Sequence, residues 1–166
     1  MCTVQVVLHA ALFLLWSRQR VAQHCPGVGR PYLFLMNDLP LKPAVLVVED
    51  EPLVRTTLAE VLQEEGFRVI QACNAAKAIL VLEARPDVSV VLADVEMPPG
   101  APGHHLATEA SRRWPHVRFV ITSGRTWPDP QDMPDSAVFM PKPWTSELLV
   151  ECVWEAADRS QLVRRR

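Results

Sequence analysis

Carboxylates, a hydroxyl and a lysine follow short apolar runs at four points of the chain, and together they could perform phosphoryl chemistry. Glu49 and Asp50 follow AVLVV, Asp94 follows VSVVLA, Ser123 follows FVIT, and Lys142 follows AVFMP. An aspartate can act as a nucleophile towards phosphorus, while a lysine and a metal ion can stabilise the phosphoryl oxygens. This chemistry requires that the fold bring the four points together.

The elements around these residues predict such a meeting. Strands are expected at 44–48, 67–72, 88–93, 117–122 and 137–140, and helices at about 52–65, 74–85, 106–114 and after residue 145. Strands that alternate with helices form a parallel sheet through right-handed crossovers, with helices on both faces. Ligands and chemistry in such sheets gather outside the carboxyl ends of the strands. The polar residues are therefore expected at one edge of the sheet.

The acids at that edge predict a metal ion. Glu49, Asp50 and Asp94 would bring together about three negative charges, and two unit charges at ~4 Å repel by ~4 kcal/mol at an effective dielectric of about 20. Lys142 alone cannot neutralise them. Hard oxygen ligands without histidine or cysteine favour Mg²⁺ over zinc.

Each of these residues also has an ordinary structural explanation when it is taken alone. Glu51 fits a first-turn helix acid, Lys142 a surface lysine, and Ser123 with Gly124 a turn. The agreement of four separate strand ends favours a site. The neighbouring histidines at 104 and 105 open the third helix and are expected to be solvent-exposed residues rather than metal ligands.

Composition predicts one ordinary globular domain. The chain has 166 residues, of which 49% are hydrophobic and 22% charged, and its formal net charge of -2 gives no reason to expect a nucleic-acid partner. Four widely spaced cysteines without a C-x-x-C pair favour a reduced, cytoplasmic setting. The basic residues at the end of the chain are expected to form a solvated tail over 160–166.

The first 38 residues stand apart as an N-terminal extension. The apolar stretch 4–16 is shorter than the ~20 residues that a membrane helix needs, and no basic segment precedes it, so neither a membrane span nor a secretion signal is expected. The extension is predicted to be disordered, or the product of a start assigned before Met36.

Four stretches resemble the receiver domain of bacterial two-component response regulators. They are VLVVEDEPLVR (45–55), VLADVEMPPG (91–100) with the later Gly103, FVITSG (119–124) and FMPKPW (139–144). They occur in the family's order within about residues 42–158. The resemblance implies a flavodoxin-like, doubly wound, five-stranded parallel sheet of strand order 2-1-3-4-5, with the receiver domain spanning 39–159.

The resemblance also implies a role for individual residues. Asp94 would be the phosphoacceptor, and Mg²⁺ would be held by Glu49, Asp50, Asp94 and the backbone carbonyl of Glu96. Ser123 would be the hydroxyl residue that turns towards the phosphoryl group, and Phe139 would be the aromatic switch residue. Lys142 would be the family's lysine, and its peptide bond to Pro143 would be cis.

Two departures from the family pattern predict local differences. Pro128, Pro130 and Pro134 fall where a receiver has its fourth helix, so that helix is expected to be irregular or missing. The loop after Asp94 is rich in proline and glycine, and Gly103 comes one residue later than the commonest spacing.

The expected function is that of a single-domain response regulator, because the chain ends soon after the last helix. A sensor histidine kinase or a phosphotransfer protein would supply the phosphoryl group, and an unknown downstream protein or a phosphate-sink role would use it. The chain is expected to be a monomer or weak homodimer and not an enzyme. The alternatives are a phosphorylation-independent binding module and an aspartate-nucleophile phosphohydrolase, for which Glu96 stands where a second acid is needed.

Overall fold

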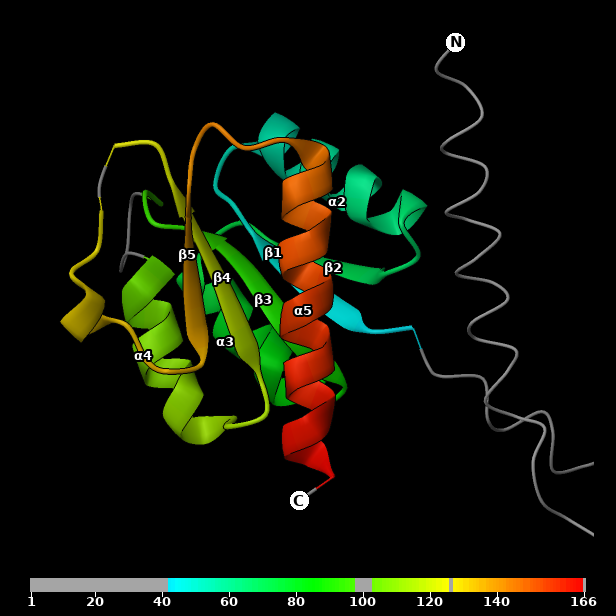
Figure 1. The fold of residues 1–166 in the computed structure, drawn as a ribbon, viewed down its shortest axis with the longest axis vertical. Helices are drawn as coiled ribbons and strands as arrows, with labels where there is room; N and C mark the ends of the chain where they lie inside the picture. The colour runs from blue at the N-terminus through cyan, green and yellow to red at the C-terminus, as the bar shows by residue number, and fades with distance from the viewer. Residues whose placement is uncertain (1–41, 98–102, 126, 166) are drawn as a thin grey trace, which may run out of the picture. The chain divides into compact units, whose positions relative to one another are not determined.

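The computed structural model describes residues 42–97, 103–125 and 127–165, and these contain a parallel sheet of five strands (Figure 1). The strand order is β2-β1-β3-β4-β5, which confirms the predicted order 2-1-3-4-5. The strands are β1 (Ala44–Val48), β2 (Arg68–Ala72), β3 (Val88–Asp94), β4 (Arg118–Ser123) and β5 (Ala137–Pro141).

The strands β1 and β3, which lie side by side in the sheet, are buried along nearly their whole length. Every residue of β1 is buried, and so are all residues of β3 before Asp94. Strands covered on both faces lack the alternation of a strand that faces water, because each side chain enters a core. Burial on both faces therefore explains why the sequence of these strands is mostly apolar and does not alternate with polar residues.

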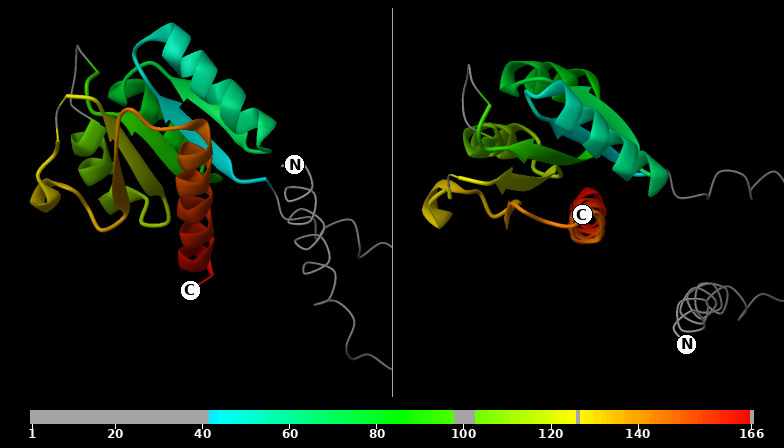
Figure 2. Two further views of the ribbon diagram at one scale, coloured as in Figure 1. Left: turned by 45° about the horizontal axis from the view of Figure 1, so that its top comes forward. Right: turned by 90° about the horizontal axis from the view of Figure 1, so that it is seen from above.

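Two helices cover each face of the sheet (Figure 2). On one face α2 (Pro52–Glu64) and α5 (Ser146–Arg164) pack over Val45, Val47 and Val120. On the other face α3 (Ala75–Ala84) and α4 (Gly103–Arg113) pack over Leu46, Val91 and Ile121. The fold is thus flavodoxin-like and doubly wound, as predicted.

Local sequence signals define the helix ends. Pro52 opens α2, where its missing N–H costs nothing, and Gly66 follows the helix with a φ of 93°. The side chain of Asn74 accepts a hydrogen bond from Lys77 N at 2.9 Å, and that of Thr145 accepts one from Leu148 N at 3.3 Å. These N-caps fix where α3 and α5 begin, a few residues after the ends of β2 and β5.

Helix α5 corrects the prediction of a solvated tail over 160–166. The helix continues to Arg164, and Ser160 within it is buried. The Arg164 guanidinium donates to Pro86 O at 2.7 Å and to Val88 O at 2.8 Å. The arginine therefore fastens the end of α5 to the start of β3.

The described part of the connection from β4 to β5 contains one short helix, the 3-10 helix η2 (Pro130–Asp132). Asp129 caps it through Gln131 N at 2.9 Å, and Thr108 Oγ1 of α4 donates to Asp132 O at 3.0 Å. The connection is therefore tied to α4. Thr126 lies outside the described residues.

The predictions for the extension 1–38, including the start at Met36, concern residues outside those described. The same holds for the loop 98–102. Among the helices of the described segments, none is both long and apolar enough to cross a membrane.

Candidate functional site

The carboxyl ends of β1, β3 and β5 bring an ammonium group between two carboxylates. Lys142 Nζ lies 3.0 Å from Asp94 Oδ2 and 3.8 Å from Glu49 Oε2. These side chains come from three strand ends that lie far apart in the sequence. The structure thus places Glu49, Asp94 and Lys142 together, as the alternating pattern predicts.

Glu49 is the most deeply placed acid of this cluster, with 4% of the residue exposed. Burial raises the pKa of its carboxyl group to about 7, and the charge of Asp94 and a hydrogen bond with Asp50 act in the same direction. The backbone N–H of Glu51, which donates to Oε1 at 3.3 Å, and the charge of Lys142 oppose this shift in pKa. Burial therefore favours the protonated form of the Glu49 carboxyl group.

Arg55 holds the backbone that carries the acid pair. Its Nη1 donates to Glu49 O at 2.7 Å and to Asp50 O at 3.3 Å. The guanidinium reaches back from α2 because residue 55 lies one helical turn beyond the loop. The sequence analysis missed this role; a basic residue five positions after the second acid, in the first turns of the helix, is the available signal.

Gly103 allows α4 to begin directly against Asp94. A Cβ at this position would overlap the carbonyl oxygen of Asp94, so no larger residue fits without movement of the backbone. Gly103 N donates to Val95 O at 3.3 Å, and Val95 N donates to Thr122 O at 2.8 Å. The glycine thus fixes the backbone on which the Asp94 side chain stands.

Ser123 and Lys142 are joined through the backbone of neighbouring strands. Ser123 is fully buried and its Oγ accepts a hydrogen bond from Arg125 N at 3.3 Å, while Lys142 N donates to Ser123 O at 2.8 Å. The Lys142–Pro143 peptide bond is cis. The hydroxyl residue, the lysine and the aspartate therefore occupy consecutive strand ends, on β4, β5 and β3.

Phe139, the predicted switch residue, is half-buried in β5. Its ring centroid lies 5.5 Å from that of Trp127, which is 70% exposed on the connection from β4. An exposed tryptophan therefore lies over the predicted switch residue.

The predicted metal ligands near Lys142 are all oxygen atoms, which is the type of ligand that Mg²⁺ prefers. Burial is the main cause of the raised pKa of Glu49, and a divalent cation would offset the smaller contribution that the charge of Asp94 makes. In the described residues, however, no three histidine, cysteine, aspartate or glutamate side chains are grouped so that they could hold a metal ion. Glu96, whose backbone carbonyl is the further predicted ligand, is half-buried just after β3.

The histidines at 104 and 105 lie in the first turn of α4, in agreement with the expectation that they open this helix. His104 is half-buried, and burial lowers the pKa of its imidazole. Its ring meets that of His105 edge-on, with the centroids 4.5 Å apart. The two rings are thus neighbours at the start of the helix, with His104 half-buried and His105 exposed.

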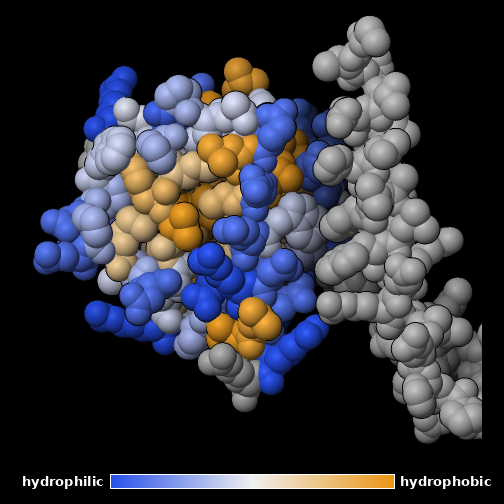
Figure 3. All heavy atoms as spheres, in the orientation of Figure 1, coloured by the Kyte–Doolittle hydropathy of each residue, from blue (hydrophilic) through white to orange (hydrophobic). Residues whose placement is uncertain are grey.

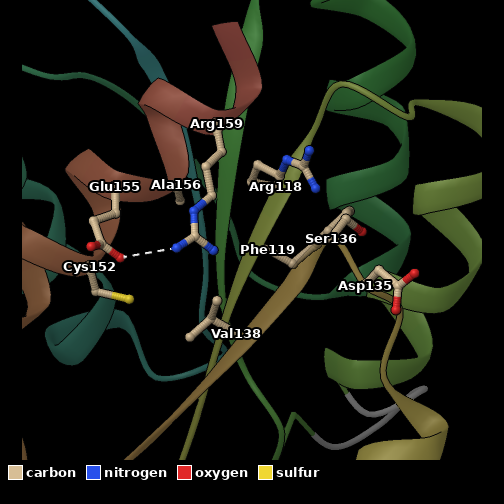
Figure 4. Close-up of a pocket in the computed structure, with 9 residues that line it drawn as sticks. All are labelled: Arg118, Phe119, Asp135, Ser136, Val138, Cys152, Glu155, Ala156 and Arg159. Atoms are coloured by element: carbon tan, nitrogen blue, oxygen red, sulfur yellow. Dashed lines mark ion pairs between the residues drawn. The ribbon is translucent and has the colours of Figure 1, made fainter. Parts of the chain in front are cut away.

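A second feature lies at the opposite, amino ends of β4 and β5. Figure 3 shows apolar surface over β5 and the adjoining side of α5, bordered by charged side chains. A hollow of about 30 Å³ lies there, and Figure 4 shows Arg118 and Arg159 on its two sides, with Arg159 paired to Glu155 at 3.6 Å. This hollow is separate from the acidic cluster, which lies at the carboxyl ends.

A doubly wound sheet of this order, with buried acids, a hydroxyl and a lysine at its carboxyl edge, defines the class of receiver-like signalling domains. Residues 45–153 match the family of response regulator receiver domains. The chain belongs to this family of two-component signalling.

Two curated relatives carry similar sequences. The hydrogenase transcriptional regulatory protein HoxA of Cupriavidus necator is 34% identical over 71% of this chain, and the sensor kinase CckA of Brucella abortus is 31% identical over 74%. The matched regions make up 25% of the length of HoxA and 13% of the length of CckA. The chain thus spans only a small part of these larger relatives.

Solved structures agree on the fold. The receiver domain of the hybrid histidine kinase CckA covers 69% of this chain with a TM-score of 0.60 and 27% identity, and 98% of that structure is matched. A response regulator receiver protein from Sinorhizobium medicae covers 72% of the chain, and 98% of its own length, with a TM-score of 0.66 at 23% identity. The second likeness supports the fold alone.

Proposed function

We propose that Asp94 accepts a phosphoryl group from a phosphohistidine of a sensor histidine kinase or phosphotransfer protein. The observation that carries this proposal is the position of Lys142 Nζ, 3.0 Å from Asp94 Oδ2 and 3.8 Å from Glu49 Oε2. Asp94 stands at a strand end with 12% of its side chain exposed, and an aspartate carboxylate in such a place can act as a nucleophile towards phosphorus.

The transfer uses the chain's own groups as follows. A carboxylate oxygen of Asp94 attacks phosphorus, the bond from phosphorus to the histidine nitrogen breaks, and the leaving imidazole keeps the electron pair. The product is an acyl phosphate on Asp94. Lys142 stabilises the charge on the phosphoryl oxygens, and the hydroxyl of Ser123 donates a hydrogen bond to one of them.

Mg²⁺ would be held by Glu49, Asp50, Asp94 and the backbone carbonyl of Glu96. When bound, it supplies positive charge that stabilises the transferring phosphoryl group. Arg55 keeps the backbone of the acid pair in place through its two hydrogen bonds, at 2.7 and 3.3 Å.

Phosphorylation would then change the face made by β4, β5 and α5. A phosphoryl group brings as many as two negative charges and strong hydrogen-bond acceptors, and these would draw Ser123 and the loop after it inward. Phe139 would turn into the space that is vacated. We also infer that the η2 connection replaces a regular fourth helix, so a downstream protein would read an unusual surface.

Incubation of the protein with acetyl phosphate and Mg²⁺, followed by intact-mass measurement, tests the proposal. The expected result is the gain of a single phosphoryl group that chelation of Mg²⁺ prevents. No gain would favour the phosphorylation-independent binding module. Repeated turnover of small phosphate esters would instead favour the aspartate-nucleophile phosphohydrolase.

A further inference from the structure

The outer strand β2 borders a second, larger hollow with a basic lining. The hollow has a volume of about 560 Å³ and lies between β2 and α3. Arg55, Lys77 and Arg85 line it, and no acidic side chain of the described residues does. We name this hollow the β2–α3 groove.

Arg55 and Lys77 supply its positive charge. Arg85 is held by Asp87 through two hydrogen bonds of 2.9 and 3.0 Å, so its charge is balanced. Arg55 donates to two carbonyl oxygens and forms no ion pair with a carboxylate of the described residues. Lys77 is exposed in the first turn of α3.

Apolar side chains accompany these charges. Leu80 is 59% exposed, and Ile70 and Val81 are half-buried behind it. Because β2 pairs only with β1 in the described sheet, its other backbone edge is open to pairing. The groove therefore combines an unpaired strand edge, apolar side chains and two cations that form no ion pair within the described residues.

We propose that the β2–α3 groove is a docking surface for an extended acidic peptide segment of a protein partner. Such a segment adds to the edge of β2 through backbone hydrogen bonds, and its alternate side chains point to opposite sides. Acidic side chains then meet Arg55 and Lys77, while aliphatic ones cover Leu80. A nucleic acid fits less well, because the chain carries a net charge of -2. The proposal is independent of phosphorylation at Asp94.

The test uses the full, unphosphorylated chain labelled with ¹⁵N and a short synthetic peptide in which glutamate and valine alternate. Amide shifts are expected in β2 and α3. Lys77→Glu is expected to weaken binding about tenfold, because it replaces an attractive charge pair by a repulsive one. Arg112→Glu, the same charge reversal at an exposed position of α4, is the control and is expected to keep the affinity within about twofold.

A second pair of variants tests the apolar contact. Leu80→Ser is expected to weaken binding about fivefold, whereas Leu162→Ser, at a leucine of α5 with 61% exposure, is expected to leave it unchanged. Peptides in which lysine replaces glutamate, or serine replaces valine, are expected to bind at least fivefold more weakly.

Several results would overturn the proposal. These are the absence of amide shifts, shifts centred outside β2 and α3, or equal losses for a variant and its control. Equal shifts with inorganic phosphate alone would assign the groove to a small anion. Shifts of the same amides on concentrating the protein without peptide would assign it to a second copy of the chain.

Discussion

Lys142 is the single ammonium group between two carboxylates, and its removal should act on the reaction rather than on the fold. Lys142→Ala is expected to slow phosphorylation by acetyl phosphate about a hundredfold, because one charged donor to the phosphoryl oxygens is lost. Quenched time courses with intact-mass detection measure this rate. Arg112→Ala, at an exposed arginine of α4, is the control. Equal rates for the lysine variant and the wild type would contradict the assignment.

A glycine is required at position 103 because the backbone there lies directly against the carbonyl oxygen of Asp94. Gly103→Ala is expected to lower the free energy of unfolding by about 2 kcal/mol, because the new methyl group meets the Asp94 carbonyl, which cannot move away cheaply. The higher helix propensity of alanine, worth about 1 kcal/mol, works against this loss.

Gly124→Ala is the matched control for this prediction. Its Cβ would lie 3.7 Å from Lys142 Cβ, an ordinary contact, so a change within about 0.5 kcal/mol is expected in urea unfolding. Equal stability of the two variants would show that the approach to Asp94 is unimportant.

For single residues, the sequence predicts which side chains of the site lie close together but not the contacts that keep them in place. Strand ends and residue types suffice to bring Glu49, Asp94 and Lys142 together. The hydrogen bonds of Arg55 and the close packing of Gly103 depend on where a helix starts in three dimensions. Local patterns do not contain that information.

Among the elements, the connection from β4 to β5 gives a direct optical test. Trp127 lies on it with its ring centroid 5.5 Å from that of Phe139. If Phe139 turns inward on phosphorylation, Trp127 loses this contact and its fluorescence should change. The change is expected to vanish in Trp127→Phe.

Trp154→Phe is the control for the optical test. The ring of Trp154 packs on that of Phe67, with the centroids 4.3 Å apart, and not on Phe139. This variant is expected to keep the fluorescence change. A change that survives in Trp127→Phe would show that the signal comes from another tryptophan and that Trp127 does not follow the switch residue.

The helices show where sequence prediction of the elements succeeds and fails. Pro52, Asn74 and Thr145 open helices as predicted, because capping is a local property. Part of the tail predicted over 160–166 is helical instead, because the Arg164 guanidinium is held by the carbonyls of Pro86 and Val88, a contact distant in sequence. Similarly, α4 begins at Gly103, ahead of the predicted residue 106, because it packs on Asp94.

For the whole molecule, an ion pair at the amino edge of the sheet makes stability depend on pH without involving the site. Asp87 meets Arg85 and Arg68 at 2.9 Å, and the hydrogen bond from Arg85 holds the pKa of Asp87 well below its usual value. A lowered pKa in the folded state stabilises the fold above the unfolded pKa of about 4, and this contribution is lost as the pH falls.

Asp87→Asn is therefore expected to lower the unfolding free energy at pH 7 by about 0.5 to 1 kcal/mol, a small value because water screens the half-exposed pair. Urea unfolding at pH 7 and pH 3 measures the difference from the wild type. The difference should be smaller at pH 3. A difference that grows as the pH falls would contradict the assigned pairing.

Separate edges of the sheet thus carry separate features: the proposed phosphoryl site at the carboxyl ends, and the contacts of Arg164 and the Asp87 ion pair at the amino ends. The central claim is that one carboxylate of the first edge takes up phosphorus. The most direct measurement is transfer of radiolabel from a phosphohistidine donor to the wild type, to Asp94→Asn and to Asp87→Asn. Label on the wild type and Asp87→Asn, with none on Asp94→Asn, is the predicted result; undiminished label on Asp94→Asn would contradict the account.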